Sequence, residues 1–236
     1  MEKLFLNTKA QAGLDKDRTR LKTKKLILQL DLILQKLNQQ KKKSVLVILQ
    51  GMDASGKDGT VKNVFSTLNP YIFSVTSFKK PSSAEQDHDF LWRVHLHAPA
   101  LGMIQVFNRS HYEDILIPEV HDLLKKDTLK RRYDFVNAFE RMLEDQGTLI
   151  FKFFLNISRA EQTERFKERL SNPEKRWKYD PQDLQEAKLW NRYMDTYYTI
   201  FKKCNAPEWI LVPADNKWYR DYVIAKTLVE SLKECV

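Results

Sequence analysis

The feature that most constrains the fold is a group of glycines placed directly behind an apolar segment. Gly51, Gly56 and Gly59 fall within nine residues, although the 236-residue chain contains only six glycines. The preceding residues 44–49 (Ser-Val-Leu-Val-Ile-Leu) predict a strand buried on both faces, and residues 60–68 predict a helix. Since glycine lets other groups approach the backbone closely, this strand–loop–helix unit indicates an α/β fold with a binding loop.

The rest of the chain repeats this alternation of strands and helices. A basic amphipathic helix is predicted at about residues 14–42. Further strands are expected at residues 72–78, 103–107, 148–157 and 209–213. Further helices are expected at residues 84–97, 131–146 and 158–170, from about 184 to 203, and from 217 onward. Because single helices separate the strands, we expect one α/β domain over residues 1–236 with five parallel strands.

Local signals mark the ends of three of these helices. Ser83 with Gln86, and Ser158 with Glu161, have the spacing of a capping box, which predicts that a helix starts at each pair. Gly147 predicts the end of the helix over residues 131–146.

Composition excludes several classes of protein. The two cysteines, Cys204 and Cys235, cannot form a disulfide framework and lie in no C-x-x-C pair, so a zinc site is not expected. No apolar run approaches the roughly 20 residues of a membrane span, and the N-terminus lacks the apolar core of a signal peptide. We therefore expect a cytoplasmic protein without a membrane partner.

The net charge of +9 is compatible with a polyanionic partner, but its distribution weakens that argument. Residues 1–50 carry 12 basic and 4 acidic side chains, a net charge of +8, so the remaining residues carry only +1. The excess charge therefore lies in the N-terminal helical region and is not itself evidence for an anionic ligand.

The glycine loop has the pattern of a phosphate-binding loop. Residues 51–57 (Gly-Met-Asp-Ala-Ser-Gly-Lys) match G-x-x-x-x-G-K between a buried strand and a helix. Backbone N–H groups of such a loop form a concave anion site, and Lys57 can neutralise a β- or γ-phosphate. The alternative is a plain strand-to-helix turn. The residues predicted to bind phosphate or nucleotide here, besides Lys57, are Gly51, Met52, Ala54, Ser55, Gly56, Asp58, Gly59 and Thr60.

Two acidic residues depart from the usual pattern. Asp58 occupies the position of the Ser or Thr that normally holds Mg²⁺, and Asp53 lies inside the loop. A carboxylate among phosphate-binding N–H groups is costly unless a cation or a substrate proton offsets it. We therefore predict that Asp53 holds Mg²⁺ or activates an acceptor oxygen, the alternative being an Asx turn within the loop.

Four segments together resemble the second family of polyphosphate kinases. They are residues 51–59, 77–81 (Ser-Phe-Lys-Lys-Pro), 107–114 (Phe-Asn-Arg-Ser-His-Tyr-Glu-Asp) and 172–178 (Asn-Pro-Glu-Lys-Arg-Trp-Lys). The resemblance extends from about residue 12 to residue 230. It implies a P-loop kinase similar in fold to thymidylate kinase: a three-layer α/β sandwich with a helical lid at about residues 165–185.

The resemblance also implies an activity and its cofactor. Members of the family move the terminal phosphoryl group of inorganic polyphosphate reversibly onto a nucleotide, here ADP to give ATP. The form Asn-Arg-Ser…Glu-Asp at residues 108–114 is similar to the third class, whose members accept AMP as well as ADP. Because Asn108 replaces a metal-binding aspartate, Asp114 is expected to hold Mg²⁺, or Mn²⁺ in its place, together with Asp53. A homo-oligomer, dimeric or tetrameric, is expected.

Cations after the second and third strands are predicted to contact the substrate, because ligands of parallel sheets collect at the carboxyl ends of strands. Lys79 and Lys80 would bind polyphosphate, or else lie in an ordinary solvated loop. Arg109 would bridge the phosphoryl oxygens during transfer, or else pair with Glu113. The other residues predicted near the nucleotide are Arg93, for which solvent is an equal alternative, Asn108 and Glu113.

A dense group of cations lies between residues 165 and 178, where nucleotide kinases carry a mobile lid. Closure of a lid brings cations to the phosphates and expels water. The alternative is a solvated charged hairpin. The lid cations predicted to bind polyphosphate are Arg169, Lys175, Arg176 and Lys178.

Two other functions remain open from the sequence. One is an ATP-dependent nucleoside monophosphate kinase with the same fold, which would not explain Lys79 and Lys80. The other is a basic P-loop protein that binds nucleic acid and hydrolyses ATP. We expect no nucleic-acid partner, because the chain lacks a helix-turn-helix or an aromatic-basic surface.

Overall fold

The computed structural model describes residues 5–172 and 181–235, and it contains one five-stranded parallel sheet. Its strands in chain order are β1 (Ser44–Gln50), β2 (Phe73–Ser77), β3 (Ile104–Asn108), β4 (Thr148–Asn156) and β5 (Trp209–Pro213). Their spatial order is β2-β3-β1-β4-β5, so the strand before the glycine loop is central and buried along its whole length. The five predicted strands and their parallel arrangement are confirmed.

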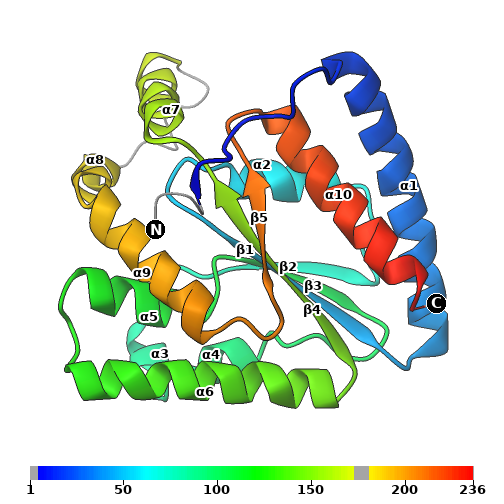
Figure 1. Cartoon of the computed structure of the whole chain (residues 1–236). Coiled ribbons are helices and arrows are strands. Elements are labelled where there is room, and N and C mark those ends of the chain that lie inside the picture. Colours follow the sequence, from blue (N-terminus) through cyan, green and yellow to red (C-terminus); the bar gives the residue numbers. More distant parts are fainter. Residues whose placement is uncertain (1–4, 173–180, 236) are drawn as a thin grey trace.

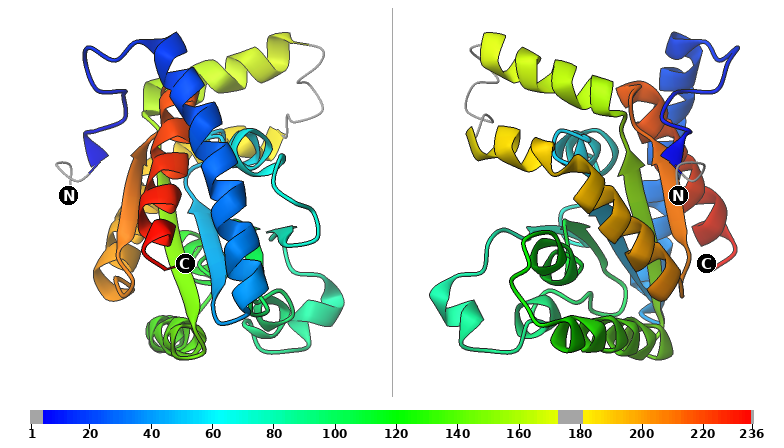
Figure 2. Two further views of the ribbon diagram at one scale, coloured as in Figure 1. Left: turned by 90° about the vertical axis from the view of Figure 1, so that its right-hand side faces the viewer. Right: turned by 60° about the vertical axis from the view of Figure 1, so that its left-hand side comes forward.

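Helices cover both faces of the sheet (Figures 1 and 2). On one face α1 (Lys16–Gln40) packs beside α10 (Lys217–Lys233), and on the other α5 (Glu113–Val120) packs against α6 (Lys126–Asp145) and α9 (Trp190–Lys203). The remaining segments are α2 (Lys57–Thr60) with the π-helical turn η2 (Val61–Phe65), α3 (Ser83–Gln86), α4 (Trp92–His95), α7 (Arg159–Ser171) and α8 (Pro181–Lys188). This arrangement confirms the predicted three-layer sandwich.

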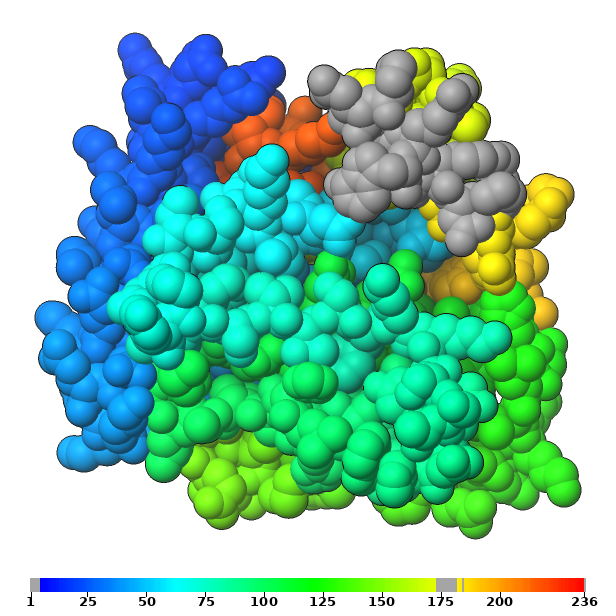
Figure 3. Space-filling model, turned by 180° about the vertical axis from the view of Figure 1, so that it is seen from behind, coloured from blue at the N-terminus to red at the C-terminus, as the bar shows by residue number. Residues whose placement is uncertain are grey.

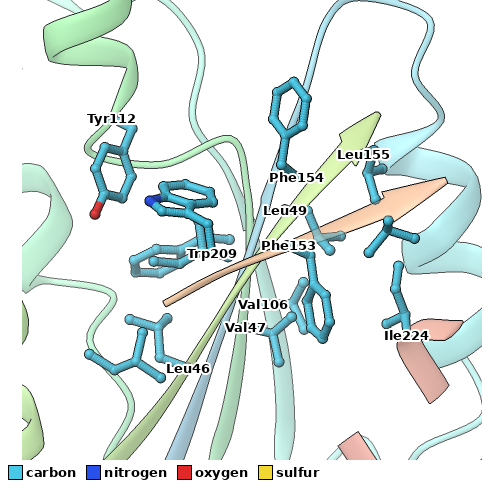
Figure 4. Packing of buried hydrophobic residues seen from close by; sticks show 14 of the residues in the cluster. Leu46, Val47, Leu49, Val106, Tyr112, Phe153, Phe154, Leu155, Trp209 and Ile224 are labelled. Carbon is cyan, nitrogen blue, oxygen red and sulfur yellow. The ribbon is translucent and has the colours of Figure 1, made fainter. Parts of the chain in front are cut away.

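The apolar core lies on both sides of the sheet. Figure 4 shows Phe153 and Ile224 on the α10 side, whereas Tyr112 and Trp209 lie on the opposite side. All four are buried, and Phe153, Ile224 and Tyr112 are fully enclosed. Seen from behind, residues from about 60 to 100 form the middle of the surface next to α1 (Figure 3). Among the described residues, no helix is long and apolar enough to cross a membrane.

The predicted helix at residues 84–97 is wrong in detail. The segment forms two short helices, α3 and α4, and the capping box is Ser82 with Glu85, one residue before the predicted pair. Both pairs have the same spacing, but Glu85 supplies a carboxylate, which accepts a stronger hydrogen bond from a backbone N–H than an amide does. Asp89 interrupts the helix because its side chain accepts the N–H of Leu91 at 2.9 Å.

Other helix boundaries also differ. The helix predicted at residues 60–68 begins at Lys57 and ends earlier as a π-helical turn, and α5 was not predicted. The expected helix up to Lys203 is divided into α8 and α9 at Leu189. The start at Ser158 is confirmed, since its side chain accepts the N–H of Glu161 at 3.1 Å.

Candidate active site

The glycine loop, the carboxyl ends of β2 and β3, and helices α7 and α10 enclose an open cavity of about 470 Å³. Its size and polar walls suit a small charged ligand. The residues that line it are Asp53, Ala54, Gly56, Lys57, Asp58, Gly59, Asn63, Ser77, Phe78, Lys79, Asn108, Arg109, Arg165, Glu168, Arg169, Asp183, Lys217 and Arg220.

Most of the predicted site residues therefore meet in one place. Of the described candidates, the ones that do not line the cavity are Gly51, Met52, Ser55, Thr60, Lys80, Arg93, Glu113 and Asp114. The predicted lid residues Lys175, Arg176 and Lys178 lie outside the described residues.

Lys57 is folded back over its own loop. Its Nζ donates to the carbonyl oxygens of Gly51 at 2.7 Å and Met52 at 3.2 Å, and the residue is only 8% exposed. Burial, with a smaller effect of Arg109, lowers the pKa of Lys57 to about 8, even though three nearby carboxylates favour the charged form. A phosphate in the cavity would favour the charged form further.

Arg165, on α7, binds the backbone of the glycine loop. Its Nη1 donates to the carbonyl oxygens of Ala54 and Ser55 at 2.8 and 2.9 Å, and its Nη2 donates to those of Ala214 and Asp215. These bonds satisfy carbonyl groups of the loop from the side of α7. Arg165 belongs to the cation-rich segment 165–178 that was predicted to form a lid. In the structure its guanidinium links the glycine loop to the residues that follow β5.

Arg220 explains two of the three clustered glycines. A Cβ on Gly56 would collide with Nη1 of Arg220, and one on Gly59 would lie 3.2 Å from its Nη2. The guanidinium is held by Asp221, whose Oδ1 accepts from Nε at 2.9 Å and from Nη2 at 2.7 Å. Arg220 was not among the residues predicted from the sequence. The available signal was Gly59, which the phosphate-loop motif does not require.

Arg109 and Asp53 form an ion pair inside the cavity. Nη2 of Arg109 lies 2.8 Å from Oδ1 of Asp53, and the side chains are 38% and 29% exposed. Burial opposes the charge of Arg109, but Glu113 and Asp53 outweigh it and raise its pKa. Burial in turn raises the pKa of Glu113. The sequence offered Glu113 as the ion-pair partner of Arg109, whereas in the structure Asp53 makes the hydrogen bond and Glu113 acts through its charge.

The backbone of Arg109 is strained. Its φ is +64°, in the left-handed region that residues other than glycine rarely adopt. Such a conformation costs about 1–3 kcal/mol and persists only where the surroundings determine it. Residues of this kind cluster at functional sites, which agrees with the position of Arg109 in the cavity.

Arg93 does not line the cavity and is almost completely buried. It is 5% exposed, and its Nη1 donates to the carbonyl oxygen of Lys79 at 2.8 Å while its Nη2 donates to Oδ2 of Asp114 at 2.9 Å. Arg93 thus fixes the backbone of the segment that carries Lys79. Asp114, which was expected to share a metal ion with Asp53, pairs with Arg93 and does not line the cavity.

Asp53 and Asp58 are the acidic side chains of the cavity that lie at the glycine loop, and carboxylates are ligands of the kind that Mg²⁺ takes. Both line the cavity beside the loop, and Oδ1 of Asp58 accepts from Nδ2 of Asn108 at 2.7 Å. No group of three or more His, Cys, Asp or Glu side chains suited to a metal occurs among the described residues. Mg²⁺ commonly uses one or two carboxylates together with substrate phosphates, so two aspartates suffice here.

Comparison with known proteins points to one family. The family described as Polyphosphate kinase 2 matches residues 13–235. The chain is 47% identical to an AMP/ADP-polyphosphate phosphotransferase of Meiothermus ruber over 192 residues, which cover 80% of this chain and 72% of that one. It is 40% identical to an ADP-polyphosphate phosphotransferase of Rhodopseudomonas palustris, over 80% of this chain and 71% of that one.

A solved structure supports the same relationship. The crystal structure of polyphosphate kinase 2 from Arthrobacter aurescens superposes with a TM-score of 0.83 at 38% sequence identity. The match covers 96% of this chain and 86% of that one. The similarity therefore extends over the sheet, the cavity and both covering layers of helices.

Proposed function

This chain belongs to the polyphosphate kinase 2 family, and we propose that its polyphosphate kinase activity serves both ADP and AMP. Transfer of the terminal phosphoryl group of polyphosphate to ADP forms ATP, and transfer to AMP forms ADP. The observation that carries the proposal is the meeting of Lys57, Asp53 and Arg109 in one cavity at the carboxyl end of the sheet. The Meiothermus ruber relative named for both nucleotides supports the choice of acceptors.

The reaction exchanges one phosphoanhydride bond for another. A phosphate oxygen of the nucleotide attacks the terminal phosphorus of polyphosphate, and the bond to the remaining chain breaks, so the step needs no net proton transfer. Backbone N–H groups of the loop and the ammonium of Lys57 would hold the phosphates, while Arg109 would neutralise charge on the transferred group. Because the bonds made and broken are similar, the reaction is expected to be reversible.

Asp53 and Asp58 are the residues that would hold Mg²⁺, or Mn²⁺ in its place. When bound, the ion supplies positive charge to the phosphate oxygens. Asp53 would also keep Arg109 oriented across the cavity through their 2.8 Å contact. Asp114 would act through its bond to Arg93, not as a ligand.

The polyphosphate chain would lie along cations from separate elements. Lys79 and Arg109 line the cavity beside the strand ends, and Arg169 lines it from α7. Lysines suit a flexible polyanion because each offers three donors without a demand for planar geometry. Lys80 and the predicted lid residues Lys175, Arg176 and Lys178 would extend this path.

The decisive experiment uses purified protein with Mg²⁺ and polyphosphate as the sole phosphoryl donor. ATP should form from ADP, and ADP should form from AMP in a separate reaction. Activity with ATP and a nucleoside monophosphate, but none with polyphosphate, would support the competing monophosphate kinase instead.

We also propose that the protein is a cytoplasmic homo-oligomer, dimeric or tetrameric. Light scattering would test the oligomeric state, and fractionation of cells would test the location.

A further inference from the structure

The segment that carries Arg109 is supported from outside the cavity. Arg109 has a left-handed backbone, and the three residues after it, Ser110, His111 and Tyr112, are completely buried. The hydroxyl of Ser110 donates to the side-chain oxygen of Gln50 at 3.0 Å and accepts from the N–H of Tyr112 at 3.2 Å. An unfavourable backbone conformation is kept only where its neighbours determine it, so the contacts of residues 110–112 bear on Arg109.

His111 and Tyr112 both contact one buried carboxylate. Oε1 of Glu140, on α6, accepts from the hydroxyl of Tyr112 at 2.8 Å and lies 3.0 Å from Nε2 of His111. Oε2 of Glu140 accepts from Nζ of Lys152, on β4, at 2.8 Å. Lys152 also donates to the hydroxyl of Tyr112 at 3.1 Å and to the carbonyl oxygen of Cys204 at 3.0 Å. We call His111, Tyr112, Glu140 and Lys152 the buried network.

The charges of the buried network need an explanation. The side chains of Glu140 and Lys152 are fully buried, and neither residue is among the described residues that line the cavity. Burial alone would raise the pKa of Glu140, but His111 and Lys152 lower it below its ordinary value, so the carboxylate stays charged. A buried ion pair often stabilises a protein no better than apolar side chains of similar size. What apolar side chains could not do is bind the hydroxyl of Tyr112 and the ring of His111.

We propose that Glu140 and Lys152 are positioning residues for phosphoryl transfer, which hold His111 and Tyr112 and thereby fix Arg109 in its orientation toward Asp53. This inference rests on the proposed function, because it assumes that Arg109 contacts the transferred phosphoryl group. The connection is short: His111 is two residues from Arg109, and Ser110, His111 and Tyr112 are all fully buried.

The test replaces the pair with apolar residues of similar size, Glu140→Leu together with Lys152→Met, so that no unpaired charge remains. We expect kcat for ATP formation from ADP and polyphosphate to fall by about tenfold or more, since small misplacements of a reacting geometry are costly. KM for both substrates should stay within about twofold, because the binding residues are unchanged. Glu144→Leu, one turn further along α6, is the matched control and should leave kcat unchanged.

A smaller variant covers the case in which the double replacement does not fold. Tyr112→Phe removes only one hydroxyl from the buried network, and we expect kcat to fall about two- to fivefold with both KM values unchanged. Cooperative unfolding of each variant confirms that the fold is retained. If kcat of every folded variant stays within about 1.5-fold of that of the unchanged protein, the positioning role is wrong.

The Arg109→Lys background separates this inference from the proposed function. If Arg109→Lys leaves kcat unchanged, the proposed role of Arg109 fails and the inference fails with it. If Arg109→Lys lowers kcat, adding the buried-network replacements should lower it by less than about twofold more, because both changes act on the same group. Full multiplication of the two effects would show that the buried network acts elsewhere, and would overturn the inference alone.

Discussion

Two ion pairs of this protein have the same length and opposite surroundings. Asp53 and Arg109 lie 2.8 Å apart in the cavity, with side chains that are 29% and 38% exposed. Glu140 and Lys152 also lie 2.8 Å apart, but both side chains are fully buried. We call them the cavity pair and the buried pair. The comparison teaches that distance alone does not decide whether an ion pair can take part in a reaction.

The difference lies in what it costs to separate the charges. A partly exposed pair contributes about 0–1 kcal/mol, so a phosphate or a metal ion can replace one partner without a large loss. Removing one partner of a buried pair leaves an uncompensated charge and costs about 3–5 kcal/mol. The cavity pair can therefore rearrange when substrates bind, whereas the buried pair holds the surrounding segments in place.

The largest effect is expected from a replacement that breaks the cavity pair. Asp53→Asn removes the charge that faces Arg109 and the carboxylate that would hold Mg²⁺. We expect kcat/KM for phosphoryl transfer to fall by about 10³-fold, with a change of less than about 1 kcal/mol in the free energy of unfolding. Coupled measurement of ATP formation and denaturant unfolding tests both parts. Asp134→Asn, on the exposed side of α6, is the control; activity of Asp53→Asn above a tenth of normal would contradict the assignment.

Breaking the buried pair should instead cause a large fall in the free energy of unfolding. Glu140→Gln leaves Lys152 charged and buried without a carboxylate, so we expect the free energy of unfolding to fall by about 3–5 kcal/mol. Denaturant titration measures the loss. Combining Glu140→Leu with Lys152→Met should recover most of that stability because neither charge remains. A loss below about 1 kcal/mol in Glu140→Gln would show that the buried pair contributes little and that the comparison fails.

The cavity should respond to alkaline pH, through Lys57, and the buried pair to acidic pH, through Glu140. The pKa of Lys57, in the cavity, is lowered to about 8, so kcat/KM should fall about tenfold per pH unit above that value as the ammonium loses its proton. The unfolded chain keeps this proton to higher pH, so the contribution of Lys57 to stability rises between pH 8 and its ordinary pKa of 10.5. Activity and stability thus change in opposite directions.

The comparison that isolates Lys57 is the unfolding free energy of the unchanged protein minus that of Lys57→Met. We expect this difference to become more favourable to the unchanged protein between pH 7 and pH 9.5. At the acidic end, the lowered pKa of Glu140 means that its contribution to stability is present above its ordinary pKa of 4.5 and is lost as pH falls through the folded value. A profile of kcat/KM that stays flat to pH 10 would contradict the assigned role of Lys57.

The same contrast explains what could be predicted from the sequence. The strands, the loop with Lys57 and Asp53, and Arg109 are all signalled by residues that are neighbours in the chain, so their positions follow from periodicity and from the parallel sheet. The contact between Asp114 and Arg93 could not be predicted in this way, because the two residues lie in different helices that only the fold brings together.

The supporting charges could not be found in this way. Arg220 reaches the glycine loop from α10, and Glu140 reaches residue 112 from α6, so only the folded structure brings them together. The sequence alone does not distinguish a buried Lys or Arg side chain from an exposed one. Lys152 was the exception that could have been noticed, because it interrupts the otherwise apolar segment Thr-Leu-Ile-Phe-Lys-Phe-Phe-Leu of a strand predicted to be buried.

The smallest expected effects concern the cations at the edge of the cavity, and they test how local the cavity's electrostatics are. Lys79 and Lys80 are both exposed, but Lys79 lines the cavity and its carbonyl group is fixed by Arg93, whereas Lys80 does not line it. We expect Lys79→Ala to raise KM for polyphosphate by about three- to tenfold and Lys80→Ala by less than about twofold, with KM for ADP unchanged in both.

Salt sharpens this last prediction. A screened exposed charge contributes little at high ionic strength, so the effect of Lys79→Ala should shrink as salt rises from about 0.05 to 0.5 M, but should not vanish if Lys79 contacts the chain directly. Equal effects of the two lysines, or equal losses for ADP and polyphosphate, would show that this edge attracts anions in general and that only the cavity pair distinguishes the substrates.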